Sequence, residues 1–113
     1  MYRGYVSSAV LLYDAAYVTV QDLEITNHSG AILGESYSQP DKMERTGVAV
    51  VAKDKGTCRG ITLRDLAIHD VNGNVYDKHM NNGGIYMTAL SPADEAATGP
   101  ARFADVLVEG CYL

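Results

Sequence analysis

The sequence predicts an all-β protein wound as a solenoid of short parallel strands. The first observation is a repeat, because "VTVQDLEI" at residues 18–25 returns as "ITLRDLAI" at 61–68 and as "VLVEGCYL" at 106–113. These copies begin 43 and then 45 residues apart, and self-similarity at such a period predicts a repeat architecture. The second observation is a slip in the alternation of apolar residues inside each copy, and the third is a further strand pattern between the copies.

The slip lies between the third and the sixth residue of each copy, as between Val20 and Leu23. Apolar residues at this spacing spread over too much of a helical wheel to form one stripe, and β-branched residues favour strands. Two short strands that meet at a corner explain the slip. The second corner residue is Asp22, Asp65 or Gly110, and these residue types tolerate the left-handed backbone that a bend requires. We expect Asp22 and Asp65 to stack in a solvated corner.

A further strand per coil is predicted at 8–13, 47–53 and 83–90, where apolar residues alternate with others. In a parallel stack, equivalent residues of adjacent coils lie about 4.8 Å apart. The chain then forms one domain of about two and a half coils, roughly 1–25, 26–68 and 69–113. We expect it to be a segment of a longer chain that stacks on the remaining coils of the same polypeptide or on other copies.

The stretches "YVTVQDLEITNHSG" and "GITLRDLAIHDVNG", each followed by a strand led by glycine, resemble the right-handed parallel β-helix of the pectin-lyase-like superfamily. The resemblance implies a carbohydrate-active protein, and with it a secreted, periplasmic or extracellular location for the longer parent. A leucine-rich repeat is the competing solenoid, since "LRDLAI" fits its pattern. Its repeats of about 20–29 residues are shorter than the period seen here.

Composition and charge limit the classes of partner and site that the chain can have. The formal charge is −5 and the pI about 4.9, which argues against a nucleic-acid partner because phosphates require a basic face. No apolar run is long enough to cross a membrane. Cys58 and Cys111 form neither a disulfide framework nor a zinc site, and we expect a buried thiol at Cys111 and a free thiol in a turn at Cys58. No cofactor is expected, with a calcium site of carboxylates as a weak alternative.

The polar residues that carry chemistry gather in the long connections after Ile25 and Ile68, which follow equivalent strands and therefore lie on one side. Asn27 aligns with Asp70 on the adjacent coil, and both also fit the interpretation of ordinary turn residues. The candidate catalytic residues are Asp70, Asp77, His79 and Glu35. The candidate substrate-binding residues are Lys78, Arg45, Tyr76, Tyr86 and His28. The densest cluster, "YDKHMNN" at 76–82, equally fits a solvated loop.

Three functions remain open. A glycoside hydrolase that uses two carboxyl groups is favoured, because the long connections hold more carboxylates than Lys and Arg. A polysaccharide lyase would use Lys78 or His79 as a base and Arg45 against a uronate carboxylate. A non-catalytic glycan-binding or adhesin β-helix would have short and uniform turns. We expect the full-length parent to be the enzyme, and this segment alone to be inactive.

Overall fold

The computed structural model describes residues 6–28, 44–71 and 83–113, and in these ranges the regular structure is β apart from one short helix. Its elements are β1 (Val6–Tyr13), β2 (Val18–Asn27), β3 (Glu44–Ala52), β4 (Thr57–Arg59), β5 (Ile61–Val71), β6 (Gly83–Ala89), α1 (Glu95–Thr98), β7 (Arg102–Ala104) and β8 (Leu107–Glu109). No helix within the described ranges has the length and apolar character needed to span a bilayer.

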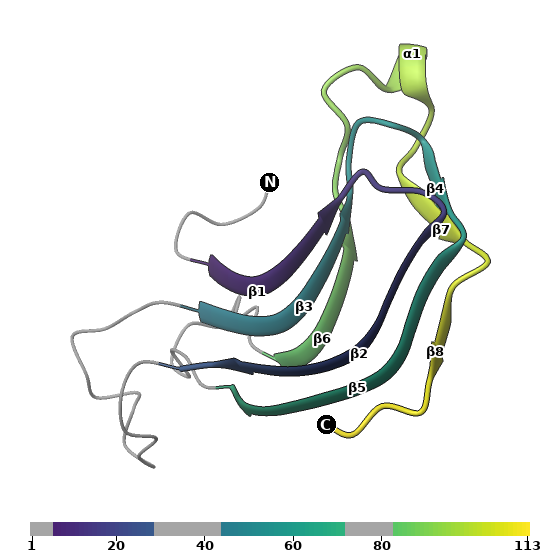
Figure 1. Cartoon of the computed structure of the whole chain (residues 1–113). Helices are drawn as coiled ribbons and strands as arrows, with labels where there is room; N and C mark the ends of the chain where they lie inside the picture. Colours follow the sequence, from purple (N-terminus) through teal and green to yellow (C-terminus); the bar gives the residue numbers. More distant parts are fainter. Residues whose placement is uncertain (1–5, 29–43, 72–82) are drawn as a thin grey trace.

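All strand pairs between these elements are parallel, and they form three sheets. The strand orders are β1-β3-β6, β2-β5-β8 and β4-β7. Each sheet therefore joins strands from successive passages of the chain, which lie over one another in Figure 1. The predicted parallel stacking of equivalent strands is confirmed.

The register of the sheets is the one that the repeat predicts. Val18 pairs with Ile61 and Val20 with Leu63, and Leu63 pairs in turn with Val108. In the other long sheet, Val48 lies between Val10 and Ile85. Apolar residues at equivalent positions of successive coils are thus stacked in columns, and each apolar side chain covers the one on the next coil.

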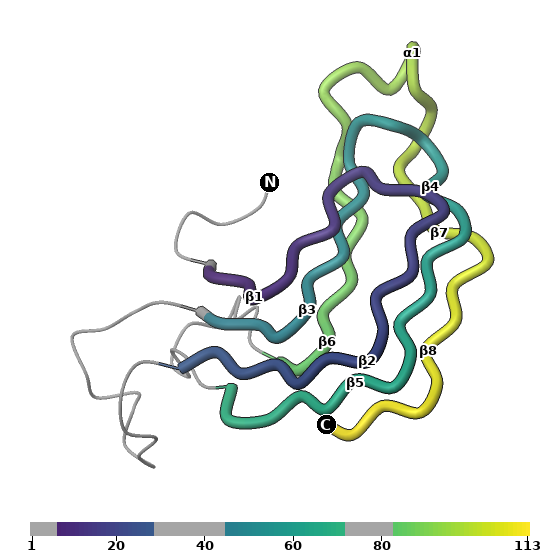
Figure 2. The backbone as a smooth tube through the Cα atoms, viewed as in Figure 1, coloured from purple at the N-terminus to yellow at the C-terminus, as the bar shows by residue number. Residues whose placement is uncertain are grey.

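The predicted corners are present, each marked by a left-handed residue. The φ angles are 60° at Asp22, 54° at Asp65 and 66° at Gly110. Both aspartates are exposed to solvent, as expected for stacked carboxylates. At Asp22 and Asp65 the bend lies inside one continuous strand, so β2 and β5 each run along two sides of the coil (Figure 2).

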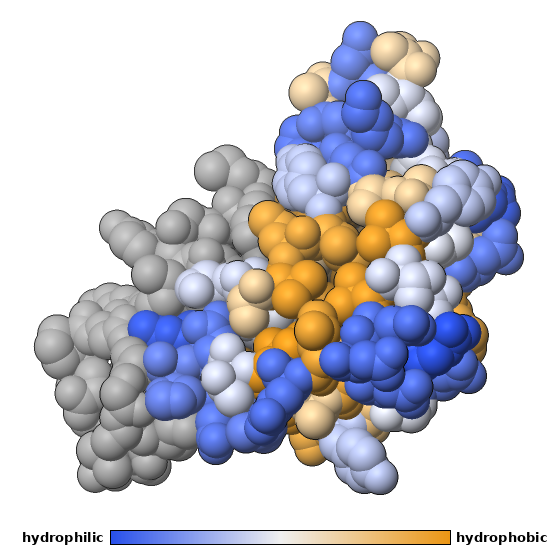
Figure 3. Space-filling model, viewed as in Figure 1, coloured by the Kyte–Doolittle hydropathy of each residue, from blue (hydrophilic) through white to orange (hydrophobic). Residues whose placement is uncertain are grey.

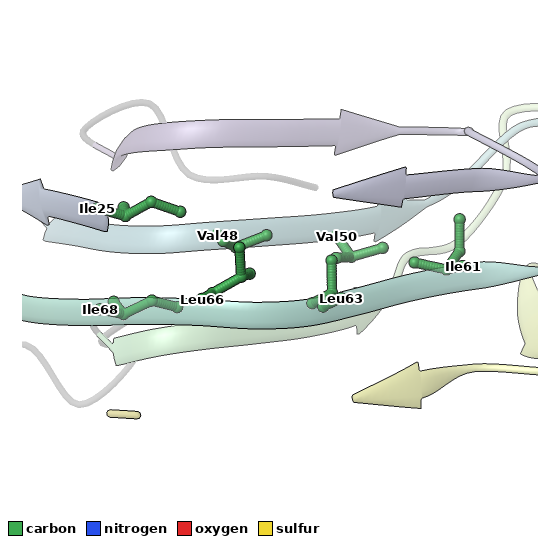
Figure 4. Close-up of a cluster of buried hydrophobic side chains, with 7 residues drawn as sticks. All are labelled: Ile25, Val48, Val50, Ile61, Leu63, Leu66 and Ile68. Carbon is green, nitrogen blue, oxygen red and sulfur yellow. The ribbon is translucent and has the colours of Figure 1, made fainter. Parts of the chain in front are cut away.

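The core lies between the two long sheets (Figure 4). Its residues are Ile25 from β2, Val48 and Val50 from β3, and Ile61, Leu63, Leu66 and Ile68 from β5. Ile61, Leu63 and Leu66 have no exposed surface. Burying a side chain of this size contributes about 1.5–3 kcal/mol, so β5, which has a neighbour on both sides, anchors the stack.

The two ends of the stack present apolar side chains. At the first coil, Val10, Leu12, Val18 and Val20 pack against the core but remain partly exposed. Figure 3 shows this end as a continuous apolar surface at the centre of the molecule. At the last coil, Val108 is 43% exposed and Leu113 is 76% exposed.

Aspartates at the turn after β1 and after β3 tie successive coils together. The Asp14 carboxylate accepts hydrogen bonds from the backbone N–H groups of Lys53, at 2.7 Å, and Asp54. The Asp54 carboxylate accepts one in turn from the backbone N–H of Ala93, at 2.9 Å. This bond, together with Lys53, lowers the pKa of Asp54 below its ordinary value of 3.8.

Two expectations are corrected here. The short strands β4 and β7 and the helix α1 lie in segments for which no strand or helix was predicted. Because β4 pairs with β7 inside the stack, Cys58 is the buried thiol, and Cys111 is only half-buried. Burial, with a further contribution from the Asp14 charge, raises the pKa of the Cys58 thiol.

Candidate functional site

The outer face of the β2-β5-β8 sheet carries polar side chains that contact one another across neighbouring strands. One such set joins three coils, since Arg64 contacts Glu109 at 2.5 Å and Gln21 at 3.4 Å. The Arg64 and Glu109 side chains are 39% and 49% exposed. An exposed pair of this kind contributes roughly 0–1 kcal/mol. These three residues support the stacking and offer no special chemistry.

A β-bulge interrupts the same sheet where β5 ends. Ile25 pairs with Ile68, but Asn27 pairs with Val71, so Thr26 faces both His69 and Asp70. Asp70 takes the left-handed conformation, with φ of 54°. In a regular strand two consecutive side chains would point to opposite faces. The bulge redirects one of them, and both side chains are exposed and in contact on the outer face.

His69 lies between two carboxylates. Its Nδ1 is 2.9 Å from Oδ2 of Asp70, and its Nε2 is 2.6 Å from Oε2 of Glu24 on β2. The hydrogen bond to Glu24, and then that to Asp70, raise the pKa of His69 above its ordinary value of 6.5. The two carboxylates occupy opposite edges of the ring and do not converge on one point. Among the described residues, no group of three acidic, His or Cys side chains is arranged to hold a metal ion.

Asn27 has a different role from the one its alignment with Asp70 suggested. Its side-chain amide donates to the backbone carbonyls of Ser7 and Thr46, both at 3.0 Å. Asn27 therefore joins the end of β2 to the first and second strands of the other long sheet. The expected stacking of Asn27 on Asp70 is wrong, because the bulge moves the register by one residue.

The candidate residues are distributed over several places. Asp70 belongs to β5 itself and not to the connection after it, because the strand continues to Val71. His28 is exposed and directly follows β2, at the same end of the sheet as Asp70. Arg45 pairs with Ser7 near the start of β3. Tyr86 pairs with Ala49 in the β1-β3-β6 sheet, between Ile85 and Met87, which pack against the core, and so lies on a different outer face from Asp70.

The remaining candidates are Glu35, Tyr76, Asp77, Lys78 and His79, and these lie outside the described residues. Sequence reasoning missed Glu24. A signal for it was present, because the repeat places Glu24 opposite Ala67, and His69 is then the next outward residue along β5. Diagonal neighbours on one face of a sheet are close enough for long side chains to meet.

A scan against protein-family models finds no match to this chain. Two crystal structures of the GH136 lacto-N-biosidase from Eubacterium ramulus resemble it, one native and one of the selenomethionine derivative. Each has 63% sequence identity over 98% of this chain, with TM-scores of 0.85 for the native protein and 0.84 for the derivative.

A curated protein from Bifidobacterium longum subsp. longum, named lacto-N-biosidase, is 40% identical in an alignment that covers 84% of this chain. The lengths differ greatly. The chain spans 7% of the length of that curated relative and 18% of the solved Eubacterium ramulus chain. The likeness is therefore to one segment of much longer proteins.

Proposed function

We propose that this chain is a segment of a glycoside hydrolase that cleaves oligosaccharides of the lacto-N-tetraose type. The observation that carries the proposal is the 63% identity, over 98% of the chain, to the GH136 lacto-N-biosidase from Eubacterium ramulus. The carboxyl groups of Asp70 and Asp77 would serve as the pair that glycosidic cleavage needs, one as the acid and the other as nucleophile or base.

The geometry around Asp70 supports this role. Its side chain is 55% exposed on the outer face, so a sugar can approach it. It sits on a bulge at the end of a strand whose preceding residues are fixed in the core, and bulges are over-represented next to active sites. Asp77 follows seven residues later in the sequence and lies outside the described residues.

The proposal includes the architecture: the segment belongs to a right-handed parallel β-helix. Three parallel sheets, each built from successive passages of the chain, support it. So do the matched corners at Asp22, Asp65 and Gly110. A right-handed path is the rule for crossovers between parallel strands of one sheet.

Further coils of the same polypeptide would cover the apolar surfaces at the two ends of the stack. Partly exposed core residues at one end, such as Val10 and Val20, and the exposed Val108 and Leu113 at the other support this. A longer enzyme that meets such oligosaccharides outside the cytoplasm would be exported. Cell fractionation of the source organism tests this last part.

The test uses the full-length polypeptide that contains this segment. It is incubated with lacto-N-tetraose and, separately, with a panel of polyuronates, and both reducing ends and the absorbance of an unsaturated uronyl product are followed. Reducing ends released from lacto-N-tetraose alone support the proposal. An unsaturated product would instead indicate elimination, and binding without any product would indicate a glycan-binding protein.

Variants then test the two carboxyl groups. Asp70→Asn and Asp77→Asn should each lower kcat by about 10²–10⁴-fold, the usual contribution of a positioned acid or base. Asp65→Asn is the matched control, because Asp65 is an exposed carboxylate of the same strand with the same left-handed φ of 54° as Asp70. Full activity in both variants would remove these residues from the site.

A further inference from the structure

We infer that Glu24 and His69 are positioning residues for Asp70: Glu24 holds the His69 ring, and the ring holds the Asp70 carboxylate in the orientation that catalysis uses. The inference rests on the proposed function, since it assigns Asp70 to the reacting pair. It adds two residues from outside that pair, one of them on a neighbouring coil, and it predicts a pH dependence that the pair alone does not require.

Both nitrogens of the His69 ring contact carboxylates. Nε2 lies 2.6 Å from Glu24 and Nδ1 lies 2.9 Å from Asp70. An ionised carboxylate only accepts hydrogen bonds, and a neutral imidazole has only one N–H to donate. The ring can therefore satisfy both carboxylates only as the imidazolium. Both pairs are exposed, as the Arg64–Glu109 pair is, so they add little to stability, and their effect is to orient the side chains.

The bulge places Asp70 where the core does not fix its side chain. A residue at the end of a strand, exposed and in a left-handed conformation, has little packing to fix its side chain. Asp70 is such a residue, with φ of 54° and a side chain that is 55% exposed. The bulge brings Asp70 onto the outer face that His69 already occupies, where the ring contacts its carboxylate. The ring thus restricts a side chain that the core does not reach.

Glu24, on the neighbouring coil, has a backbone position that the core fixes. Glu24 belongs to β2, whose register with β5 is fixed on either side of it by the pairs Leu23–Leu66 and Ile25–Ile68. Ile25, Leu66 and Ile68 are buried. The core therefore fixes the position of the Glu24 backbone. The hydrogen bond between the Glu24 side chain and His69 then restrains the orientation of the ring. Misplacing a reacting group by about 1 Å can cost about 10²-fold in rate.

The charged state of His69 gives the inference a distinctive readout. Within the described residues, the charged groups that contact the ring are Glu24 from β2 and Asp70 from β5. On the following coil, Tyr112 forms a bridge with Ala67, two residues before His69. The two carboxylates raise the pKa of His69. The ring therefore keeps both hydrogen bonds below that raised pKa and loses one of them as the pH rises through it. Removing Glu24, the larger cause, should return the pKa toward 6.5.

The experiment compares the full-length enzyme with its Glu24→Gln variant on lacto-N-tetraose between pH 5 and 9. The side chain of Glu24 is 72% exposed, so the substitution should not disturb folding. We expect kcat to fall by about 10-fold to 100-fold with KM changed less than about twofold, as for a misplaced reacting group. The alkaline limb of kcat should move to lower pH, and Glu24→Asp should recover part of the loss.

Glu109→Gln is the matched control. It removes an exposed carboxylate from the cross-strand pair with Arg64 on the same sheet, away from Asp70. We expect both kcat and its pH profile to stay unchanged. An active wild type whose Glu24→Gln variant keeps kcat and the alkaline limb would overturn this inference and leave the proposed function standing. A wild type that releases no product would overturn the proposed function and this inference together.

Discussion

The substitution Gly47→Ala tests how closely β3 and β6 approach where the two long sheets meet. A Cβ atom at Gly47 would lie 2.5 Å from Cγ2 of Ile68 and 2.7 Å from the carbonyl oxygen of Gly84. The first contact is to a buried core side chain and the second is to the backbone of the next coil. Neither neighbour is the free end of a flexible side chain, so the strands themselves would have to separate.

The magnitude follows from these contacts. Ordinary contacts begin near 3.4 Å, so the added methyl group intrudes by several tenths of an ångström on both sides. Overpacking of this kind costs about 1–3 kcal/mol, and we expect the upper half of this range because the backbone oxygen cannot move alone. With a urea slope of about 1–3 kcal/mol/M, the unfolding midpoint should fall by roughly 1 M.

The assay is urea unfolding of the chain and its variants, followed by far-UV circular dichroism. Gly99→Ala is the control, because Gly99 has a φ of 75° and an added Cβ there would meet nothing within 4 Å. It tests the conformational cost alone, about 1–2 kcal/mol. A midpoint for Gly47→Ala equal to the wild type, or above that of Gly99→Ala, would refute the close approach of the two strands.

Three further predictions concern the core, the corner and the turns. Leu63→Ala removes a fully buried side chain and should lower the free energy of unfolding by about 2–5 kcal/mol in the same urea assay. Asp65→Val places a β-branched residue at a φ of 54° and should destabilise the chain, whereas Asp65→Asn should not. The lowered pKa of Asp54 means that its stabilising effect is present above pH 3.8 and is lost as the pH falls through the folded-state value; Asp54→Asn should therefore flatten the acid dependence of the thermal midpoint in this range.

Much of the fold could be predicted because apolar side chains alternate along the strands of each repeat in the same way. The slip at Asp22 and Asp65 predicted both the corner and its left-handed backbone, and the register between β2 and β5 followed from matching apolar residues. The glycines that lead the third strand of each coil also lie together, since Gly84 is close to Gly47.

Other features left no such signal. The strands β4 and β7 have three residues each, too few for a periodic pattern, and so the burial of Cys58 could not be predicted. The bulge at Asp70 begins after Ile68, the last residue of β5 that belongs to the core. Beyond that residue no column of apolar side chains fixes the register, and the equivalence of Asn27 and Asp70, drawn by extending the repeat, failed there.

The place of the bulge follows from the same reasoning. A register slip of one residue would turn every later side chain to the opposite face, and the core forbids this wherever apolar residues are stacked. The strand end after Ile68 is the first position at which an extra residue moves none of the buried core side chains, and the only residue of β5 beyond the bulge is Val71, which is partly buried against the core. A stacked architecture can therefore accept a left-handed Asp70 and two exposed, adjacent polar side chains at this point without losing its core contacts. The contact from Glu24 then ties this irregular end to a strand whose register is fixed, so an exposed carboxylate can have a defined orientation.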